Sequence, residues 1–230
     1  MKLDIKFQES SHSFTPKFGE VHNVSDGGYE RGYTEGYEKG YGQCESNVVG
    51  IIERNIADFS NDKITSIGAN AFRGCTNLNN INAPNAKDVW SNSFSDCTKL
   101  TTAYLPSVTR VWQYAFLNCF ALVDIVLTNA TIIYSRAFDS CRGIVRLDLP
   151  SIETIESYAL TGARALETLI IRADTVCTLK SADALNSTPI ASGTGFVYVP
   201  DALVDSYKAA TNWSTYADQI KPISELEVAS

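Results

Sequence analysis

Apolar residues recur along the middle of this chain at a constant spacing of 22 residues. One column holds phenylalanine or leucine, a second holds cysteine or alanine, and a third holds leucine or isoleucine. A fixed period of this length is typical of solenoids, in which each unit buries its apolar face against the next. The columns are Phe72, Phe94, Phe116, Phe138 and Leu160; Cys75, Cys97, Cys119, Cys141 and Ala163; and Leu78, Leu100, Leu122, Ile144 and Leu166.

Each unit, here called a rung, also carries a pattern of the type L-x-x-L-x-L, as in Leu122, Ile125 and Leu127. Its last two apolar positions are two residues apart and therefore fall on one side of a β-strand. An earlier aliphatic pair, such as Val108 and Val111, predicts a second, shorter extended segment. The spacing of three between the phenylalanine and cysteine columns predicts a short helical turn. A rung is therefore expected to contain a strand, a bend, an extended segment and a helical turn.

The unit IGANAFRGCTNLNNINAPN and its copies resemble the BspA-like leucine-rich repeat family, over roughly Asn61 to Asp174. The resemblance implies an α/β repeat fold: a leucine-rich-repeat solenoid of parallel β-strands and short helical turns. It also implies a binding protein, since such repeats offer a long regular surface rather than a pocket. Proteins of this family are often secreted or displayed on a surface.

The loss of the period on either side predicts the organisation of the chain. Phe59 precedes Ile81 by 22 residues and indicates a degenerate first rung. Downstream, residues 196–199 predict a strand, and Asp201 predicts the N-cap of a helix over 202–210. The expected regions are an N-terminal extension (1–42), an N-terminal cap (43–60), five repeats (61–175) and a C-terminal cap (176–230).

The N-terminal extension carries glycine and tyrosine every four residues, which places them on adjacent stripes of a helix. Small residues at this spacing allow two helices to approach closely, so the stripes predict a helix for self-association or docking. The alternative is a flexible, partly helical tether, because glycine disfavours helices. The residues are Gly28, Gly32, Gly36 and Gly40, with Tyr29, Tyr33, Tyr37 and Tyr41.

The same region, FGEVHNVSDGGYERGYTEGYEKGYGQ, resembles the openings of bacteriophage and prophage structural proteins. That resemblance implies a virion protein, associated with the phage tail and released by lysis. The first residues, MKLDIKFQESSHSF, show no apolar core of a secretory signal, which agrees with this route.

Composition narrows the function classes. The net charge is −7 without a basic block, which argues against nucleic-acid binding, and no apolar run is long enough to span a membrane. The cysteine ladder is expected to be packed core, because C-x-x-C pairs are missing and the two histidines, His12 and His22, lie far from the repeats. No catalytic residue, metal site or cofactor is therefore predicted, and the protein is expected not to be an enzyme.

The best candidate for a binding surface is the column that follows the second extended segment. Trp90, Trp112 and Tyr134 would form an aromatic stripe there, and aromatic and arginine side chains are favoured at protein interfaces. The alternative is that the rings stack on one another and only stabilise the solenoid. The flanking residues two positions on are Tyr114, Arg136 and Tyr158.

These observations predict a non-enzymatic binding or structural repeat protein, tail-associated in a phage or prophage, that mediates attachment. Its partners would be a protein or glycan on a host surface, or other virion subunits, with a homo-oligomer formed through the N-terminal helix. The alternative is a BspA-like adhesin on a bacterial cell surface. Asp124 and Arg146, in neighbouring rungs, are expected to pair across the outer face.

Overall fold

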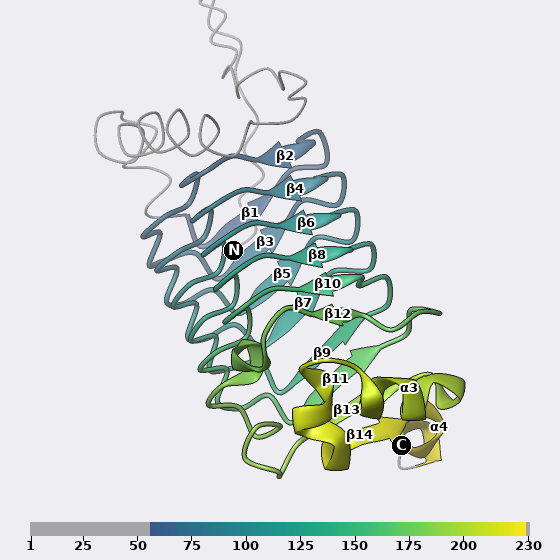
Figure 1. The fold of residues 1–230 in the computed structure, drawn as a ribbon. Coiled ribbons are helices and arrows are strands. Elements are labelled where there is room, and N and C mark those ends of the chain that lie inside the picture. Colours follow the sequence, from purple (N-terminus) through teal and green to yellow (C-terminus); the bar gives the residue numbers. More distant parts are fainter. Residues whose placement is uncertain (1–55, 229–230) are drawn as a thin grey trace, which may run out of the picture.

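The structure is a computed structural model that describes residues 56–228. Its repeats form a solenoid with two rows of parallel strands, stacked rung upon rung (Figure 1). In the first row, β1, β3, β5 and β7 form one sheet, and β9, β11, β13 and β14 form another. The bounds are Asp58–Ser60 (β1), Asn80–Asn82 (β3), Thr102–Tyr104 (β5), Asp124–Val126 (β7), Arg146–Leu149 (β9), Thr168–Ile171 (β11), Phe196–Val199 (β13) and Ile220–Pro222 (β14).

The second row is a single sheet of six two-residue strands. It corresponds to the shorter extended segment that the sequence predicts. Its members are Ser66–Ile67 (β2), Asp88–Val89 (β4), Arg110–Val111 (β6), Ile132–Ile133 (β8), Thr154–Ile155 (β10) and Thr178–Leu179 (β12).

The strand register follows the 22-residue period. Phe59 in β1 pairs with Ile81 in β3, and Ile81 pairs in turn with Ala103 in β5. The predicted degenerate first rung is therefore confirmed. In each of these strands the central residue points into the core, as alternation along a strand requires.

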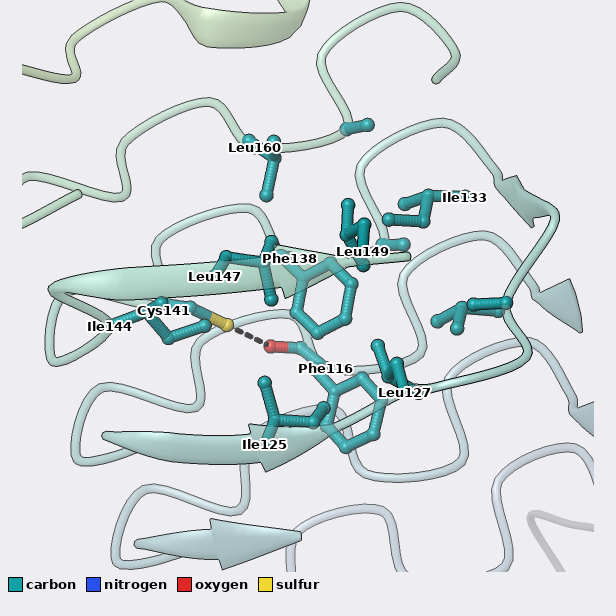
Figure 2. Close-up of a cluster of buried hydrophobic side chains, with 14 of the residues drawn as sticks. Phe116, Ile125, Leu127, Ile133, Phe138, Cys141, Ile144, Leu147, Leu149 and Leu160 are labelled. Carbon is teal, nitrogen blue, oxygen red and sulfur yellow. Dashed lines mark hydrogen bonds between the residues drawn. The ribbon is translucent and has the colours of Figure 1, made fainter. Parts of the chain in front are cut away.

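The core is built from the sequence columns. Phe72, Phe94, Phe116 and Phe138 stack with ring centroids 5.0–5.2 Å apart, at the spacing of the rungs. The ladder cysteines are buried free thiols, which confirms their reading as core residues. Figure 2 shows two of the rings between the aliphatic side chains of β7 and β9, with the thiol of Cys141 directed at the carbonyl of Phe116.

The segment holding the phenylalanine and cysteine columns is not helical, which corrects one detail of the predicted rung. It is a run of turns in which successive amides donate alternately to a carbonyl of the next rung and to a carbonyl of their own rung. Phe72 donates to Ser93 in the next rung at 2.7 Å, whereas Cys75 donates within its own rung to Phe72 at 3.0 Å. The spacing of three arises from these turns, so Phe and Cys still point to the same side.

Two columns of these turns adopt the left-handed conformation, in which asparagine and glycine are the most tolerant residues. One contains Asn70 and Asn92 at φ 58° and 57°, followed by Tyr114, Arg136 and Tyr158 at φ 56–61°. The other contains Gly74, Asp96, Asn118, Ser140 and Gly162.

The C-terminal region continues the first row and covers the end of the second. It comprises three 3₁₀ helices and two short α-helices besides β13 and β14. The helices are Ala182–Leu185 (η1), Asp201–Leu203 (η2), Val204–Ala209 (α3), Trp213–Gln219 (η3) and Ile223–Val228 (α4). The predicted strand over 196–199 is confirmed, while β14 and α4 were not anticipated.

Side chains of this region satisfy main-chain groups along the open edge of β12. The hydroxyl of Tyr207 accepts from the amide of Cys177 at 2.9 Å, and the indole of Trp213 donates to the Cys177 carbonyl at 2.7 Å. Asn212 donates to the carbonyl of Leu179 at 2.7 Å. These three side chains take the place of a further strand and so close the sheet.

Asp201 does not cap its own helix as the sequence predicts. It is the first residue of η2, and its carboxylate accepts from the amide of Ser224 in α4 at 3.2 Å. Hydrogen bonding to the side chain of Ser224, and then to its amide, lowers the pKa of Asp201 below its usual value. Asp201 therefore ties the start of α4 to the end of β13.

Two further expectations need correction. Asp124 and Arg146 are both exposed but form none of the ion pairs found among residues 56–228. Ile170 occupies an outward position of β11, where alternation along the strand predicts exposure, yet it is buried. It lies between Asp148 and Tyr198 in the strand register, on the face opposite its core-facing neighbour Leu169. The predicted glycine and tyrosine stripes of residues 28–41 lie outside the described residues.

Candidate binding surface

The parallel strands of the second row place the predicted aromatic stripe in register. The amide of Trp90 donates to Ile67 at 3.0 Å, and the amides of Trp112 and Tyr134 donate to the corresponding carbonyls one rung back, each at 2.9 Å. Each aromatic residue thus follows its strand at an equivalent position. The structure brings the three rings together, as the 22-residue spacing predicts.

The rings stack almost in parallel. The centroids of Trp90 and Trp112 are 4.8 Å apart at 9°, and those of Trp112 and Tyr134 are 4.5 Å apart at 4°. All three side chains are half-buried. The stacked rings therefore stabilise the solenoid, and part of their aromatic surface remains exposed to solvent.

Polar contacts fix the indole rings in place. Trp90 Nε1 donates to Ser66 Oγ at 2.8 Å, and Trp112 Nε1 donates to Asp88 Oδ1 at 3.3 Å. Asp88 also forms an ion pair with Arg110 over 2.7 Å. The guanidinium of Arg110 lies 5.5 Å from the centre of the Trp112 ring. The carboxylate of Asp88 therefore links the arginine to the stripe.

The flanking residues Tyr114, Arg136 and Tyr158 all occupy left-handed positions. The Arg136 guanidinium lies 4.7 Å from the ring centre of Tyr158, and it pairs with Asp139 at 2.9 Å. A bulky residue in this conformation costs about 1 kcal/mol or more. Two earlier rungs use asparagine at the same position, so the larger side chains are not required by the backbone.

A second exposed surface lies beside the first row of strands, and the sequence interpretation missed it. Phe120, Val123 and Val145 expose 37%, 55% and 46% of their area, and the Arg142 guanidinium lies 4.7 Å from the centre of the Phe120 ring. A signal was present in the sequence, because the equivalent positions of the preceding rung hold threonine. They are Thr98 and Thr101.

Burial suppresses the chemistry of the cysteines. It raises the pKa of the Cys141 thiol far above its usual value and that of Cys177 to about 12. Among residues 56–228, no group of three or more histidine, cysteine, aspartate or glutamate side chains is placed to hold a metal ion. The part of the chain that the structure describes also contains no helix with the length and apolarity needed to cross a membrane.

Comparison with known proteins gives structural relatives of low identity. None of the curated proteins matches this chain. A leucine-rich cell-surface protein from Faecalibacterium prausnitzii matches 50% of this chain and 38% of its own, with 25% identity and a TM-score of 0.40. A leucine-rich repeat protein from Bacteroides ovatus matches 65% of this chain and 44% of its own, with 20% identity and a TM-score of 0.43. The chain thus spans less than half the length of either protein.

The family comparison covers the solenoid itself. The model of the BspA type leucine-rich repeat region matches residues 54–180 in six copies. Six copies agree with five regular rungs preceded by the degenerate rung at Phe59. The chain therefore belongs to the BspA type leucine-rich repeat family.

Proposed function

We propose that this protein is a non-enzymatic attachment protein that binds a protein or glycan through the aromatic stripe Trp90, Trp112 and Tyr134. The observation that carries the proposal is the flanking column of Tyr114, Arg136 and Tyr158. These residues hold unfavourable left-handed positions that asparagine serves elsewhere in the same column. Strain of this kind is retained where the side chain has a use, and recognition of a partner is the use that fits an open aromatic surface.

A bacterial cell surface is the location that we favour. Family membership rests on residues 54–180, which are the repeats themselves. The interpretation as a phage-tail protein rests on the N-terminal segment, which lies outside the described residues and which the family match does not include. The virion assignment therefore has no support beyond that resemblance, and the adhesin reading takes precedence.

The experiment that tests this function replaces the strained tyrosines with the residue that the column uses elsewhere. Tyr114→Asn with Tyr158→Asn removes two rings and gives the backbone a better left-handed residue. We expect lost attachment to a glycan array or to host cells, with thermal stability unchanged or slightly raised. Tyr104→Asn is the matched control, since Tyr104 is an exposed tyrosine on the other sheet.

Two outcomes would contradict the proposal. Attachment by the double variant at the wild-type level would show that the flanking tyrosines take no part in recognition, and would remove the observation that carries the proposal. A wild-type protein that attaches to neither cells nor glycans would remove the attachment function itself.

We also propose that residues 1–42 form a separate extension that mediates self-association, ahead of a cap at 43–60, the repeats at 61–175 and a closing cap at 176–230. The period-four glycine and tyrosine stripes support this division. Deleting residues 1–42 is expected to reduce an oligomer to a monomer in light scattering. An unchanged mass would reject the self-association.

A further inference from the structure

The main-chain hydrogen bonding of the first row is interrupted at one place. The amides of Val123 and Asp124 both donate to Thr101, at 3.0 and 3.1 Å, and those of Glu167 and Thr168 donate to Val145 at the same two distances. Between these rungs, the equivalent amides of Val145 and Arg146 make no main-chain bond to Val123 in the described structure. β7 and β9 consequently end two separate sheets, and we call the boundary between them the seam.

Gly143 brings the chain close to the preceding rung at the start of the seam, as Gly195 does before the paired strand β13. A Cβ at Gly143 would lie 2.7 Å from the carbonyl oxygen of Leu122, which is too close for any side chain. The close approach of this loop coincides with the loss of pairing in the strands that follow. The seam is therefore a local departure from the repeat, and Figure 2 shows its two strands carrying Ile125 and Leu147.

Exposed apolar side chains border the seam on both sides. Phe120 and Val123 precede β7, and Val145 precedes β9. Ile125, in the core column, is 8% exposed, whereas its neighbours Ala103 and Leu147 are 2% and 1% exposed. Apolar surface is thus most accessible where the strand pairing fails, and grouped exposure of this kind marks contact sites.

Three exposed arginines surround this apolar surface. Arg142 and Arg164 occupy one column in successive rungs, where neighbouring strands are ~4.8 Å apart, so their charges repel each other. Neither they nor Arg146 take part in the ion pairs found among the described residues, whereas Arg110, Arg136 and Arg172 each pair with an aspartate. An anionic partner would relieve this repulsion.

We propose that the seam binds an extended peptide segment of another protein, rich in alternating apolar and acidic residues. Its apolar side chains pack on Phe120, Val123 and Val145. Its carboxylates pair with the surrounding arginines, and the peptide lies across the outer face of the two strands. Asp124 and Glu167 border the same surface, so the carboxylates of the peptide are directed to the column of Arg142 and Arg164.

This inference assigns a second binding site, on the other row of strands, and does not depend on attachment through the aromatic stripe. The test measures binding of a fluorescent peptide of alternating valine and glutamate by anisotropy. Peptides of alternating valine and lysine, and of alternating serine and glutamate, are the comparison probes. We expect the valine–glutamate peptide to bind at least tenfold more tightly than either.

The protein variants separate the seam from general electrostatics. Arg142→Ala with Arg164→Ala is expected to weaken binding of the valine–glutamate peptide at least tenfold, and Val145→Ser at least threefold. The control, Lys87→Ala with Lys180→Ala, removes two exposed charges elsewhere and is expected to change binding less than twofold. Equal effects of the two double variants, or equal binding of the three peptides, would overturn the proposal.

Hydrogen exchange provides a second readout at the seam. The amide of Arg146 is expected to exchange much faster than that of Asp124, its equivalent in the preceding rung. Equal protection of both amides without peptide would contradict the seam. Peptide binding that survives Tyr114→Asn with Tyr158→Asn would separate this site from the aromatic stripe. Failure of the peptide to bind, with attachment through the stripe intact, would reject the seam proposal alone.

Discussion

The thiol of Cys141 donates a hydrogen bond to the main-chain carbonyl of Phe116 in the preceding rung, over 3.1 Å. Cys119 and Cys97 make the same contact to Phe94 and Phe72. The cysteine column therefore joins successive rungs through polar contacts inside an apolar core. A valine or leucine in this column would pack but could not donate.

Burial of these thiols predicts that they resist chemical modification. Cys75, Cys97, Cys119, Cys141 and Cys177 are all buried, and a thiol must be accessible as the thiolate to react. Ellman's reagent is expected to leave all five unmodified in the native protein and to modify them in guanidinium chloride. Native labelling of any of the five, located by mass spectrometry, would contradict the packing.

The raised pKa values predict a loss of stability at alkaline pH. Burial raises the pKa of Cys177 and that of Tyr207 to about 12, above their unfolded values. The folded state therefore holds these protons longer, so the stabilisation is complete below pH ~9 and decreases as pH rises toward 12. For each group, the free energy of unfolding falls by up to about 1.4 kcal/mol per pH unit between its unfolded and its folded pKa. Urea unfolding at pH 8 and pH 10.5 measures the difference in the free energy of unfolding. Cys177→Ala is expected to make that free energy fall less steeply with pH.

Removing the central ring of the stripe is expected to destabilise the solenoid. Trp112 stacks on two rings, and each aromatic pair is worth about 0.5–1.5 kcal/mol beyond its buried area. Trp112→Ala should therefore lower the free energy of unfolding by about 2–3 kcal/mol. Tyr104→Ala, in an exposed residue, should change it by less than about 0.5 kcal/mol. Equal effects in denaturant titrations would argue against the stack.

The hydrogen bonds that close β12 predict that removing one polar group from Tyr207 or Trp213 destabilises the protein. Tyr207→Phe leaves the buried amide of Cys177 without its hydroxyl acceptor, and Trp213→Phe removes the donor to the Cys177 carbonyl. An unsatisfied buried group costs about 1–3 kcal/mol. Each variant should lower the midpoint of thermal unfolding by several degrees, whereas Tyr104→Phe should not. A midpoint unchanged in both would show that the edge needs no such cover.

The two glycines Gly143 and Gly68 should respond oppositely to alanine. A Cβ at Gly143 would meet the Leu122 carbonyl at 2.7 Å, whereas a Cβ at Gly68 would meet nothing within 4 Å. Gly143→Ala is therefore expected to cost more than about 1 kcal/mol, and Gly68→Ala to be neutral or stabilising. Circular dichroism melts of the two variants compare them directly, and equal melts would place the close approach in doubt.

The repeat made the regular part of the fold predictable, because the period of columns such as Phe94 and Phe116 is imposed by stacking. The turns were mistaken for helix, since a run of turns and a helix both give a spacing of three. Asn70 and Asn92 could have revealed the left-handed turns. The seam was beyond prediction, because β7 and β9 carry the same apolar columns as the paired strands.

The aromatic stripe was predicted, but its dual character was not. The sequence left open whether Trp90 and Trp112 bind or stack, and the structure shows rings that stack and stay partly exposed. The exposed apolar surface at Phe120 was missed because the interpretation followed the most aromatic column. A comparison of each rung with its predecessor, position by position, would have found it.

The side chains that cover β12 also determine how this protein can change its length. Duplication of a 22-residue rung among the regular repeats reproduces the edge that the next rung needs. The same duplication placed after Leu179 would separate Tyr207, Asn212 and Trp213 from the main-chain groups that they satisfy. New rungs are therefore expected to arise upstream of β12, while the terminal 50 or so residues pass unchanged from one length variant to the next.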